Sequence, residues 1–285
     1  MKKYISEFIG TAMMMVAGCL TSVAVNIMVT AIGFSIPMAL TTTTCALAFG
    51  LGTMAAYYCF SDISGAHLNP AVSLANLIAG SLSAKKFFGY VAAQLLGALL
   101  GVGITALVLG DRTTLFASGY DSYSTFGSSV VAAAAIEAVM TFVFVYVFLA
   151  VSRKEELKNV SGLIIGLAFA MTYMVEIPIT GGGANPAKSF ATALLQSNSE
   201  SLTQLWIFII APLLGAAVAA LVYIFLNSDD SKEEIEESDE DDEEADEAEE
   251  PKDETADSEA ETEDEGSDVE SAVATENAEG TPEEE

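Results

Sequence analysis

The sequence predicts an all-α membrane protein with six spanning helices and two short helices that enter the bilayer from opposite faces. Three observations support this fold: six long apolar segments, a tripeptide that occurs once in each half, and an uneven distribution of Lys and Arg between the loops. With 285 residues, 52% of them hydrophobic, the chain is long enough to supply all of these elements.

Charge divides the chain near residue 226. Residues 1–226 carry nine basic and nine acidic side chains, whereas residues 227–285 carry two basic and thirty-one acidic ones. A segment this acidic and this poor in apolar residues cannot bury enough surface to offset its ordering entropy. We therefore expect a membrane domain over 1–226 and an acidic, disordered tail over 227–285. The alternative for the tail is a docking segment for a basic partner.

Six segments each have about 20 mostly apolar residues, the length that crosses the bilayer core as a helix. Lipid offers the backbone no hydrogen-bond partner, so the segments must satisfy their own backbone groups as helices. The expected spans are residues 5–27, 36–60, 87–109, 129–151, 160–177 and 204–226.

The basic residues of the short loops indicate the orientation. With the N-terminus in the cytoplasm, seven of them lie inside and only Arg112 lies outside, which agrees with the positive-inside rule. We expect a multi-pass protein of the plasma membrane with both termini in the cytoplasm. The seven inner residues are Lys2, Lys3, Lys85, Lys86, Arg153, Lys154 and Lys158.

A lipoprotein signal peptide is the competing interpretation of the N-terminus. Two lysines, an apolar run and a small-residue stretch that ends at Cys19 resemble one. Glu7 interrupts the apolar run, however, and cleavage would remove a span. The three cysteines, including Cys19, have no metal-ligand spacing and fit small buried side chains.

Two apolar segments, 69–79 and 185–196, are too short to span and begin with the same tripeptide, Asn-Pro-Ala. Asn is a favoured N-cap and Pro is favoured at the first helical position. Capping uses the side-chain oxygen and leaves the amide N–H groups free to point beyond the helix end. The sequence therefore predicts two re-entrant half-helices. Their first residues are Asn69, Pro70 and Ala71, and Asn185, Pro186 and Ala187.

The two halves match elsewhere as well. Glu7 in the first span corresponds to Glu137 in the fourth, and Gly97 and Gly215 each follow a Leu-Leu pair in the third and sixth. Because each half has three spans, the second half must be inverted in the membrane. Inverted repeats place a conduction site near the midplane, between discontinuous helices.

These motifs resemble the aquaporin and glycerol-facilitator family, the major intrinsic proteins, over about residues 4–226 of this chain. The chain resembles the water-channel branch of the family more than the glycerol branch. It implies a right-handed bundle of six spans and two half-helices in the lipid bilayer, and a homotetramer with one pore per subunit. It implies passive conduction, with no enzyme activity, cofactor, metal or nucleic-acid partner.

The resemblance also assigns candidate site residues. Glu7 and Glu137 would brace the re-entrant loops from behind, although either alone could be a residue near the interface. His67 would lie at the inner pore mouth, where gating by protonation competes with simple packing and a loop hydrogen bond. The outer selectivity filter would consist of Phe49, Tyr173, Gly182 and Lys188.

This filter is atypical. Water-selective members of the family carry Phe, His, a small residue and Arg, and glycerol conductors carry Trp, Gly, Phe and Arg. Here Tyr173 occupies the position of His and Lys188 the position of Arg. Ser189 and Ala193, in contrast, favour the water type. Glu176 has two open interpretations, a solvated carboxylate in the outer vestibule or a charge partner of Lys188.

The leading functional hypothesis is passive conduction of water and other small neutral solutes. Half-helix dipoles and amide donors would exclude ions and protons. The first alternative is a glycerol or polyol facilitator, which needs a wider filter. The second is a junction or scaffold protein with a closed pore that recruits partners through its acidic tail.

Overall fold

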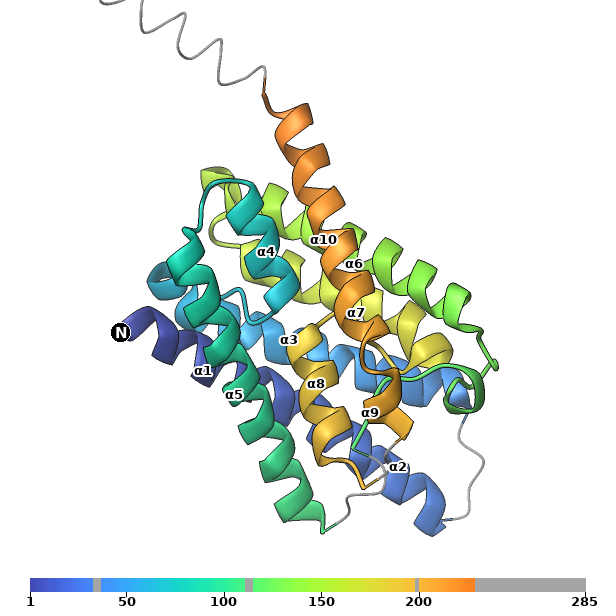
Figure 1. Cartoon of the computed structure of the whole chain (residues 1–285). Helices are drawn as coiled ribbons and strands as arrows, with labels where there is room; N and C mark the ends of the chain where they lie inside the picture. Colours follow the sequence, from blue (N-terminus) through green and yellow to red (C-terminus); the bar gives the residue numbers. More distant parts are fainter. Residues whose placement is uncertain (33–36, 111–114, 198–199, 229–285) are drawn as a thin grey trace, which may run out of the picture. The chain divides into compact units, whose positions relative to one another are not determined.

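The computed structural model describes residues 1–32, 37–110, 115–197 and 200–228, and this part of the chain is helical without a strand. Six helical stretches are long and apolar enough to cross a membrane, which confirms the six predicted spans (Figure 1). Arg112 and the tail from residue 229 lie outside the described residues. The spans are Lys2–Ala31, Met38–Ser64, Ala84–Leu109, Val130–Ser152, Ser161–Thr180 and Glu200–Leu226.

Each half contains two spans, a half-helix and a third span, in that order. In the first half these are α1 (Lys2–Met15), a π-helical turn (Val16–Leu20), α2 (Thr21–Ile32), α3 (Met38–Ser64), α4 (Pro70–Ile78) and α5 (Ala84–Leu109). In the second half they are α6 (Val130–Ser152), α7 (Ser161–Thr180), α8 (Pro186–Leu195), α9 (Glu200–Gln204) and α10 (Ile207–Leu226). Short 3₁₀ turns at Asp121–Tyr123 and Glu155–Leu157 lie in connections.

Helix packing follows the repeat. The first helix of each half packs on the two other spans of that half: α1 on α3 and α5, and α6 on α7 and α10. The halves join through α3 against α7. Each half-helix also contacts the last span of the other half, because α4 packs on α10 and α8 packs on α5. Figure 1 shows α4 and α8 running in opposite directions from the middle of the bundle.

The first span is longer than predicted and contains a π-helical turn that the sequence did not reveal. Gly18 lies within this turn, and a Cβ there would be 2.2 Å from the ring of Phe49. Single π turns inside α-helices are frequent at functional sites. Because Gly18 has no side chain, this turn leaves room for the ring of Phe49, a predicted filter residue.

Glycines permit the closest helix crossings. A Cβ on Gly97 of α5 would lie 2.3 Å from the carbonyl oxygen of Phe8 on α1. The matching residue of the second half, Gly215 of α10, would bring a Cβ within 2.1 Å of the carbonyl oxygen of Ala138 on α6. Small residues at these crossings allow close backbone contact, which holds membrane helices together in the absence of a hydrophobic effect.

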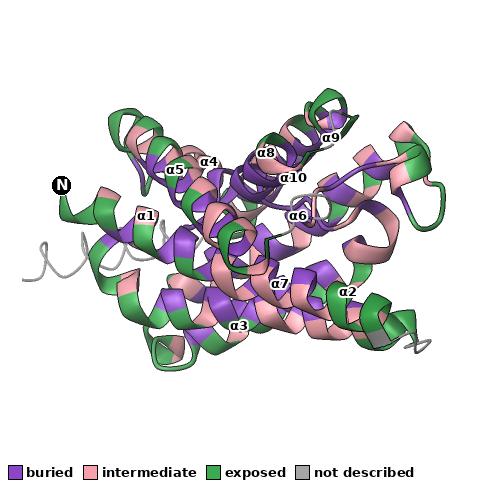
Figure 2. Cartoon of the chain, turned by 90° about the horizontal axis from the view of Figure 1, so that it is seen from below, coloured by how far each residue is buried: buried purple, intermediate pink, exposed green. Residues whose placement is uncertain are grey.

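Apolar side chains also cover the outside of the bundle, as expected of a surface in contact with lipid. Leu107, Val131 and Phe225 are among the large apolar residues that are well exposed. Figure 2 shows buried residues along the inward sides of the helices and exposed residues at the ends and outer sides. Buried polar residues, in contrast, include Ser73 and Asn76 of α4 and Ser189 and Thr192 of α8.

We predict that Gly215→Ala lowers the melting temperature of the detergent-solubilised protein, because the new methyl group meets a backbone oxygen that cannot rotate away. The matched control is Gly103→Ala in α5, where a Cβ meets no atom within 4 Å. There the loss of unfolded-state entropy should stabilise the protein by about 0.4–1 kcal/mol. Equal effects of the two substitutions would contradict a tight α6–α10 crossing.

Candidate functional site

Both half-helices begin as the tripeptides predict. Asn69 caps α4, with its Oδ1 accepting from the backbone N–H of Ala71 at 2.8 Å. Asn185 caps α8, with its Oδ1 accepting from the N–H of Ala187 at 3.0 Å. A proline occupies the first turn in each case. Two helix N-termini, each with a partial positive charge, thus face the interior of the bundle.

The two capping amides bond across to the opposite loop. Asn69 Nδ2 donates to the carbonyl oxygen of Ala184, and Asn185 Nδ2 donates to the carbonyl oxygen of Leu68, each at 2.9 Å. Each acceptor is the residue immediately before the other asparagine. The sequence analysis expected both N–H groups of each amide to stay free. Instead, one N–H group of each amide bonds the opposite loop, and the second N–H group of each amide can donate to another acceptor.

Glu7 lies behind the first loop, where bracing requires it. Its carboxylate is fully buried and accepts four hydrogen bonds, so both oxygens are used. Two donors are the backbone N–H groups of His67 and Leu68, at 2.9 and 2.8 Å. The other two are Ser64 Oγ at 2.7 Å and Gln94 Nε2 at 2.8 Å.

Two buried carboxylates lie against the second loop. Glu137 is fully buried, its Oε1 accepts from Thr180 Oγ1, and a Cβ on Gly183 would lie 2.6 Å from its Oε2, so this carboxylate lies behind the loop as predicted. Glu176 Oε2 also accepts from the backbone N–H groups of Gly183 and Ala184, at 3.1 and 3.2 Å. Glu176 is also fully buried. The interpretation of Glu176 as a solvated vestibule carboxylate is therefore wrong.

Three of the four predicted filter residues pack tightly together. The rings of Phe49 and Tyr173 have centroids 4.8 Å apart, and both side chains are fully buried. A Cβ on Gly182 would lie 3.1 Å from the Tyr173 ring, so this ring occupies the space that a larger residue at Gly182 would need. The three residues therefore form one tightly packed, largely aromatic surface.

Lys188, the fourth predicted filter residue, extends from the first turn of α8 and is fully buried. Its Nζ donates to the carbonyl oxygens of Gly181 and Gly182, at 3.1 and 2.6 Å, and to Ser118 Oγ at 2.9 Å. Within the described residues it forms no ion pair with Glu176, which was the other open interpretation of that carboxylate. Burial lowers the pKa of Lys188 to about 8, so most of the ammonium keeps its charge at neutral pH.

The connection between α5 and α6 supplies two residues that contact the predicted filter and that the sequence analysis missed. The ring of Phe116 stacks on Phe49 with centroids 5.8 Å apart, and Lys188 Nζ lies 5.1 Å from its centre. Ser118 Oγ bonds both Lys188 Nζ and the carbonyl oxygen of Gly182. No local motif marks either residue.

Cavities open on both sides of this constricted centre. The first vestibule, of about 410 Å³, is lined by residues that include His67, Asn76 and Tyr90. The second vestibule, of about 620 Å³, has Phe116 and Gly181 in its wall. Between them lie the buried asparagines and filter side chains, so the chain has the arrangement of a pore with two mouths and a narrow middle.

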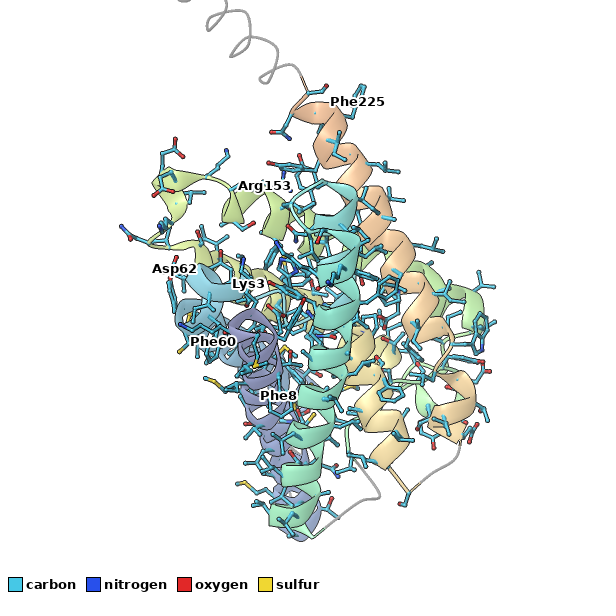
Figure 3. All side chains as sticks on the ribbon, turned by 60° about the vertical axis from the view of Figure 1, so that its left-hand side comes forward. Lys3, Phe8, Phe60, Asp62, Arg153 and Phe225 are labelled. Carbon is cyan, nitrogen blue, oxygen red and sulfur yellow. The ribbon has the colours of Figure 1, made fainter. Side chains whose placement is uncertain are left out.

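Five of the seven basic residues assigned to the cytoplasmic side line the first vestibule. They are Lys3, Lys86, Arg153, Lys154 and Lys158. Figure 3 shows Lys3, Asp62 and Arg153 at the same end of the bundle. Arg153 also lies over the ring of Tyr223, near the C-terminal end of α10, at 4.9 Å. The two ends of the described chain therefore lie on the same side.

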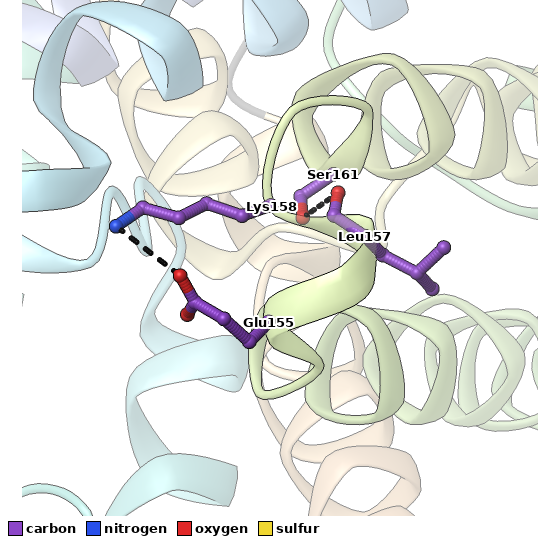
Figure 4. Close-up of polar contacts among 4 residues, drawn as sticks. All are labelled: Glu155, Leu157, Lys158 and Ser161. Carbon is purple, nitrogen blue, oxygen red and sulfur yellow. Dashed lines mark hydrogen bonds and ion pairs between the residues drawn. The ribbon is translucent and has the colours of Figure 1, made fainter.

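Two local contacts lie in the loop at this mouth. Lys158 Nζ lies 3.8 Å from Glu155 Oε1, and Ser161 Oγ donates to the carbonyl oxygen of Leu157 at 2.7 Å (Figure 4). Both charged side chains are largely exposed, so this ion pair adds little stability.

His67 is nearly buried in the wall of the first vestibule. Its Nδ1 shares a hydrogen bond with Ser73 Oγ at 3.1 Å, and its ring contacts the edges of Tyr90 and Phe148. Burial lowers the pKa of His67, and the nearby carboxylate of Glu7 opposes this shift. A neutral, packed histidine with a loop hydrogen bond fits these contacts better than a proton-operated gate.

Comparison with known proteins agrees with this geometry. The family model described as Major intrinsic protein matches residues 1–223. Aquaporin Z of Bradyrhizobium diazoefficiens is 34% identical over 235 residues, covering 80% of this chain and 95% of that protein. Glycerol uptake facilitator protein-like 6 of Lactiplantibacillus plantarum is 36% identical, covering 81% of this chain and all of that protein.

A solved structure shares the fold. The X-ray structure of the aquaglyceroporin from Plasmodium falciparum superposes with a TM-score of 0.65 at 20% identity, covering 78% of this chain and 94% of that one. At that identity the likeness concerns the fold alone. Taken with the matched family model and the two relatives, it shows that this chain is a multi-pass membrane protein of the major intrinsic protein family, whose members are channels.

Proposed function

We propose that this chain conducts water, with other small neutral solutes, passively across the plasma membrane while excluding ions and protons. The observation that carries the proposal is the crossed pair of asparagine amides at two opposed helix N-termini. A cation there loses hydration and meets the positive ends of two half-helices. A water that accepts from both remaining N–H groups cannot also pass a proton along a hydrogen-bonded chain.

The narrow filter favours water over larger solutes. Tyr173 fills the space beside Gly182, and Phe116 adds a third ring next to Phe49. Conduction of glycerol is the second candidate, because relatives with glycerol facilitator and aquaglyceroporin names are among the similar proteins. We further infer both termini in the cytoplasm, because the basic first vestibule and the ends of the described chain lie on one side. A homotetramer is inferred from the family alone.

We expect purified protein in liposomes to raise osmotic water permeability well above the lipid background, with a low activation energy and no ion current. Stopped-flow light scattering under sucrose, glycerol and urea gradients measures this, with empty liposomes as the control. Lipid-like water permeability would remove the main support for the proposal. A large glycerol flux with little water flux would favour the second candidate.

Lys188 provides a test of the outer barrier. Lys188→Arg should keep water conduction, because a permanent charge remains at the same place. Lys188→Val removes the charge and the three hydrogen bonds, and should admit protons or small cations. Water flux and proton leak are measured in the same liposomes. If Lys188→Val stays as proton-tight as the parent, exclusion rests on the asparagine pair and the helix dipoles.

The orientation predicts labelling from one side only. In a cysteine-free background, Thr125→Cys, in the wall of the second vestibule, should react with an impermeant maleimide added to intact cells. Asn227→Cys, at the end of α10, should react only after the cells are opened. The reverse pattern would place both termini outside.

A further inference from the structure

An irregular segment of the connection between α5 and α6, residues 115–120, is bonded to the chain beside the predicted filter. The backbone N–H of Gly119 donates to the carbonyl oxygen of Thr180 at 2.8 Å. Ser118 Oγ donates to the carbonyl oxygen of Gly182 at 2.9 Å. Both acceptors lie where α7 ends and the second re-entrant loop begins. The segment is therefore held at the outer end of the filter.

The side chain of Gln196 anchors the part of this segment that carries Phe116. Gln196 is the C-cap of α8, and its Oε1 accepts from the backbone N–H groups of Leu115 and Ala117, at 3.0 and 3.4 Å. Because the N–H groups on both sides of Phe116 share one acceptor, the backbone curls around that oxygen. Phe116 accordingly has a φ of +65°, a left-handed conformation that is uncommon for a bulky residue. Conformations of this kind persist where the surrounding contacts impose them, and they cluster at functional sites.

The ring of Phe116 is the one that the second vestibule reaches. It stacks on Phe49 at an interplanar angle of 28°, and Lys188 Nζ lies 5.1 Å from its centre. The rings of Phe49 and Tyr173 are fully buried, whereas Phe116 lines the vestibule. A solute that enters from that side therefore meets Phe116 before the other two rings.

We propose that Phe116 is a specificity-determining residue, whose ring narrows the outer entrance of the filter against three-carbon polyols such as glycerol, and that Gln196 positions it. The inference deepens the proposed water conduction and rests on it. Pore diameter is a main cause of selectivity in channels of this kind, so a ring at the entrance acts on solute size. The ring keeps its place only while both flanking N–H groups are held, so the size limit depends on one amide oxygen outside the filter.

Removal of the ring tests the size limit directly. We expect Phe116→Ala to raise the ratio of glycerol to water permeability about tenfold, the lower end of the discrimination that a close-fitting apolar wall provides. Proton leak should stay near the parent value, because Lys188 keeps its charge and its three hydrogen bonds. The measurement is stopped-flow light scattering of the full chain in liposomes under glycerol and sucrose gradients, with an entrapped pH dye for the leak.

Two further variants separate loss of the ring from a folding defect. Phe126→Ala is the matched control, because it makes the same chemical change in the same connection, at a side chain that is 68% exposed. It should leave the permeability ratio unchanged. Phe116→Gly removes the ring and accepts the left-handed φ without strain. It should raise the ratio as Phe116→Ala does, and it keeps the test available if the alanine variant folds poorly.

The role of Gln196 is tested by rescue and by its dependence on the ring. Gln196→Leu removes the shared acceptor and should raise the permeability ratio nearly as far as Phe116→Ala. Gln196→Glu keeps an acceptor oxygen and should stay within about threefold of the parent. In the Phe116→Ala background, Gln196→Leu should add nothing, because the ring that it positions is absent. A purely structural role would instead give additive effects.

Three results would overturn the proposal. An unchanged permeability ratio in both Phe116→Ala and Phe116→Gly would mean that the ring does not limit solute size. A proton leak as large as that of Lys188→Val would mean that the ring acts by holding Lys188. Additive effects of Gln196→Leu and Phe116→Ala would remove the positioning role. Absence of water flux in the parent would instead count against the proposed function, while the rise in glycerol flux on removal of the ring would still test this inference.

Discussion

The crossed hydrogen bonds from the Asn69 amide to Ala184 and from the Asn185 amide to Leu68 are the interaction on which the rest of this structure depends. Two irregular backbone segments lie in the middle of the bundle, where lipid offers no hydrogen bonds and their backbone groups need partners within the protein or in the pore. Each segment ends at an asparagine whose amide satisfies the carbonyl group just before the other asparagine. The loop of each half therefore needs a hydrogen bond from the other half, so both halves of the inverted repeat are required.

Much of this arrangement could be predicted from the sequence, because its signals are local. A span is visible as a long apolar segment. A half-helix start is visible because Asn and Pro are suited to the N-cap and the first turn by their own chemistry. The two copies of the tripeptide then indicate the repeat. For this reason the six spans, the caps and the place of Glu7 behind the first loop agree with the sequence analysis.

Residues brought in by long-range contacts could not be predicted in this way. Phe116 and Ser118 reach Lys188 from about 70 residues away, and neither belongs to a recognisable motif. Glu176 gave a partial signal, since Tyr173, Glu176 and Thr180 are three and four residues apart and share one face of α7. That spacing shows that the carboxylate faces inward. It does not show whether a charge, a hydroxyl group or a backbone N–H will meet it.

An arginine at the outer constriction would supply both a positive charge and free hydrogen-bond donors, whereas the contacts of Lys188 leave only the charge. A guanidinium has five N–H donors, so several remain for a passing solute after the protein has bound some of them. An ammonium has three, and here Gly181, Gly182 and Ser118 provide three acceptors. All three are uncharged, so the positive charge is not neutralised by an ion pair. Lys188 thus carries a charge at the predicted outer constriction while its three donors are bound within the protein, and in the proposed channel hydrogen bonding to the solute would fall to the amides of Asn69 and Asn185.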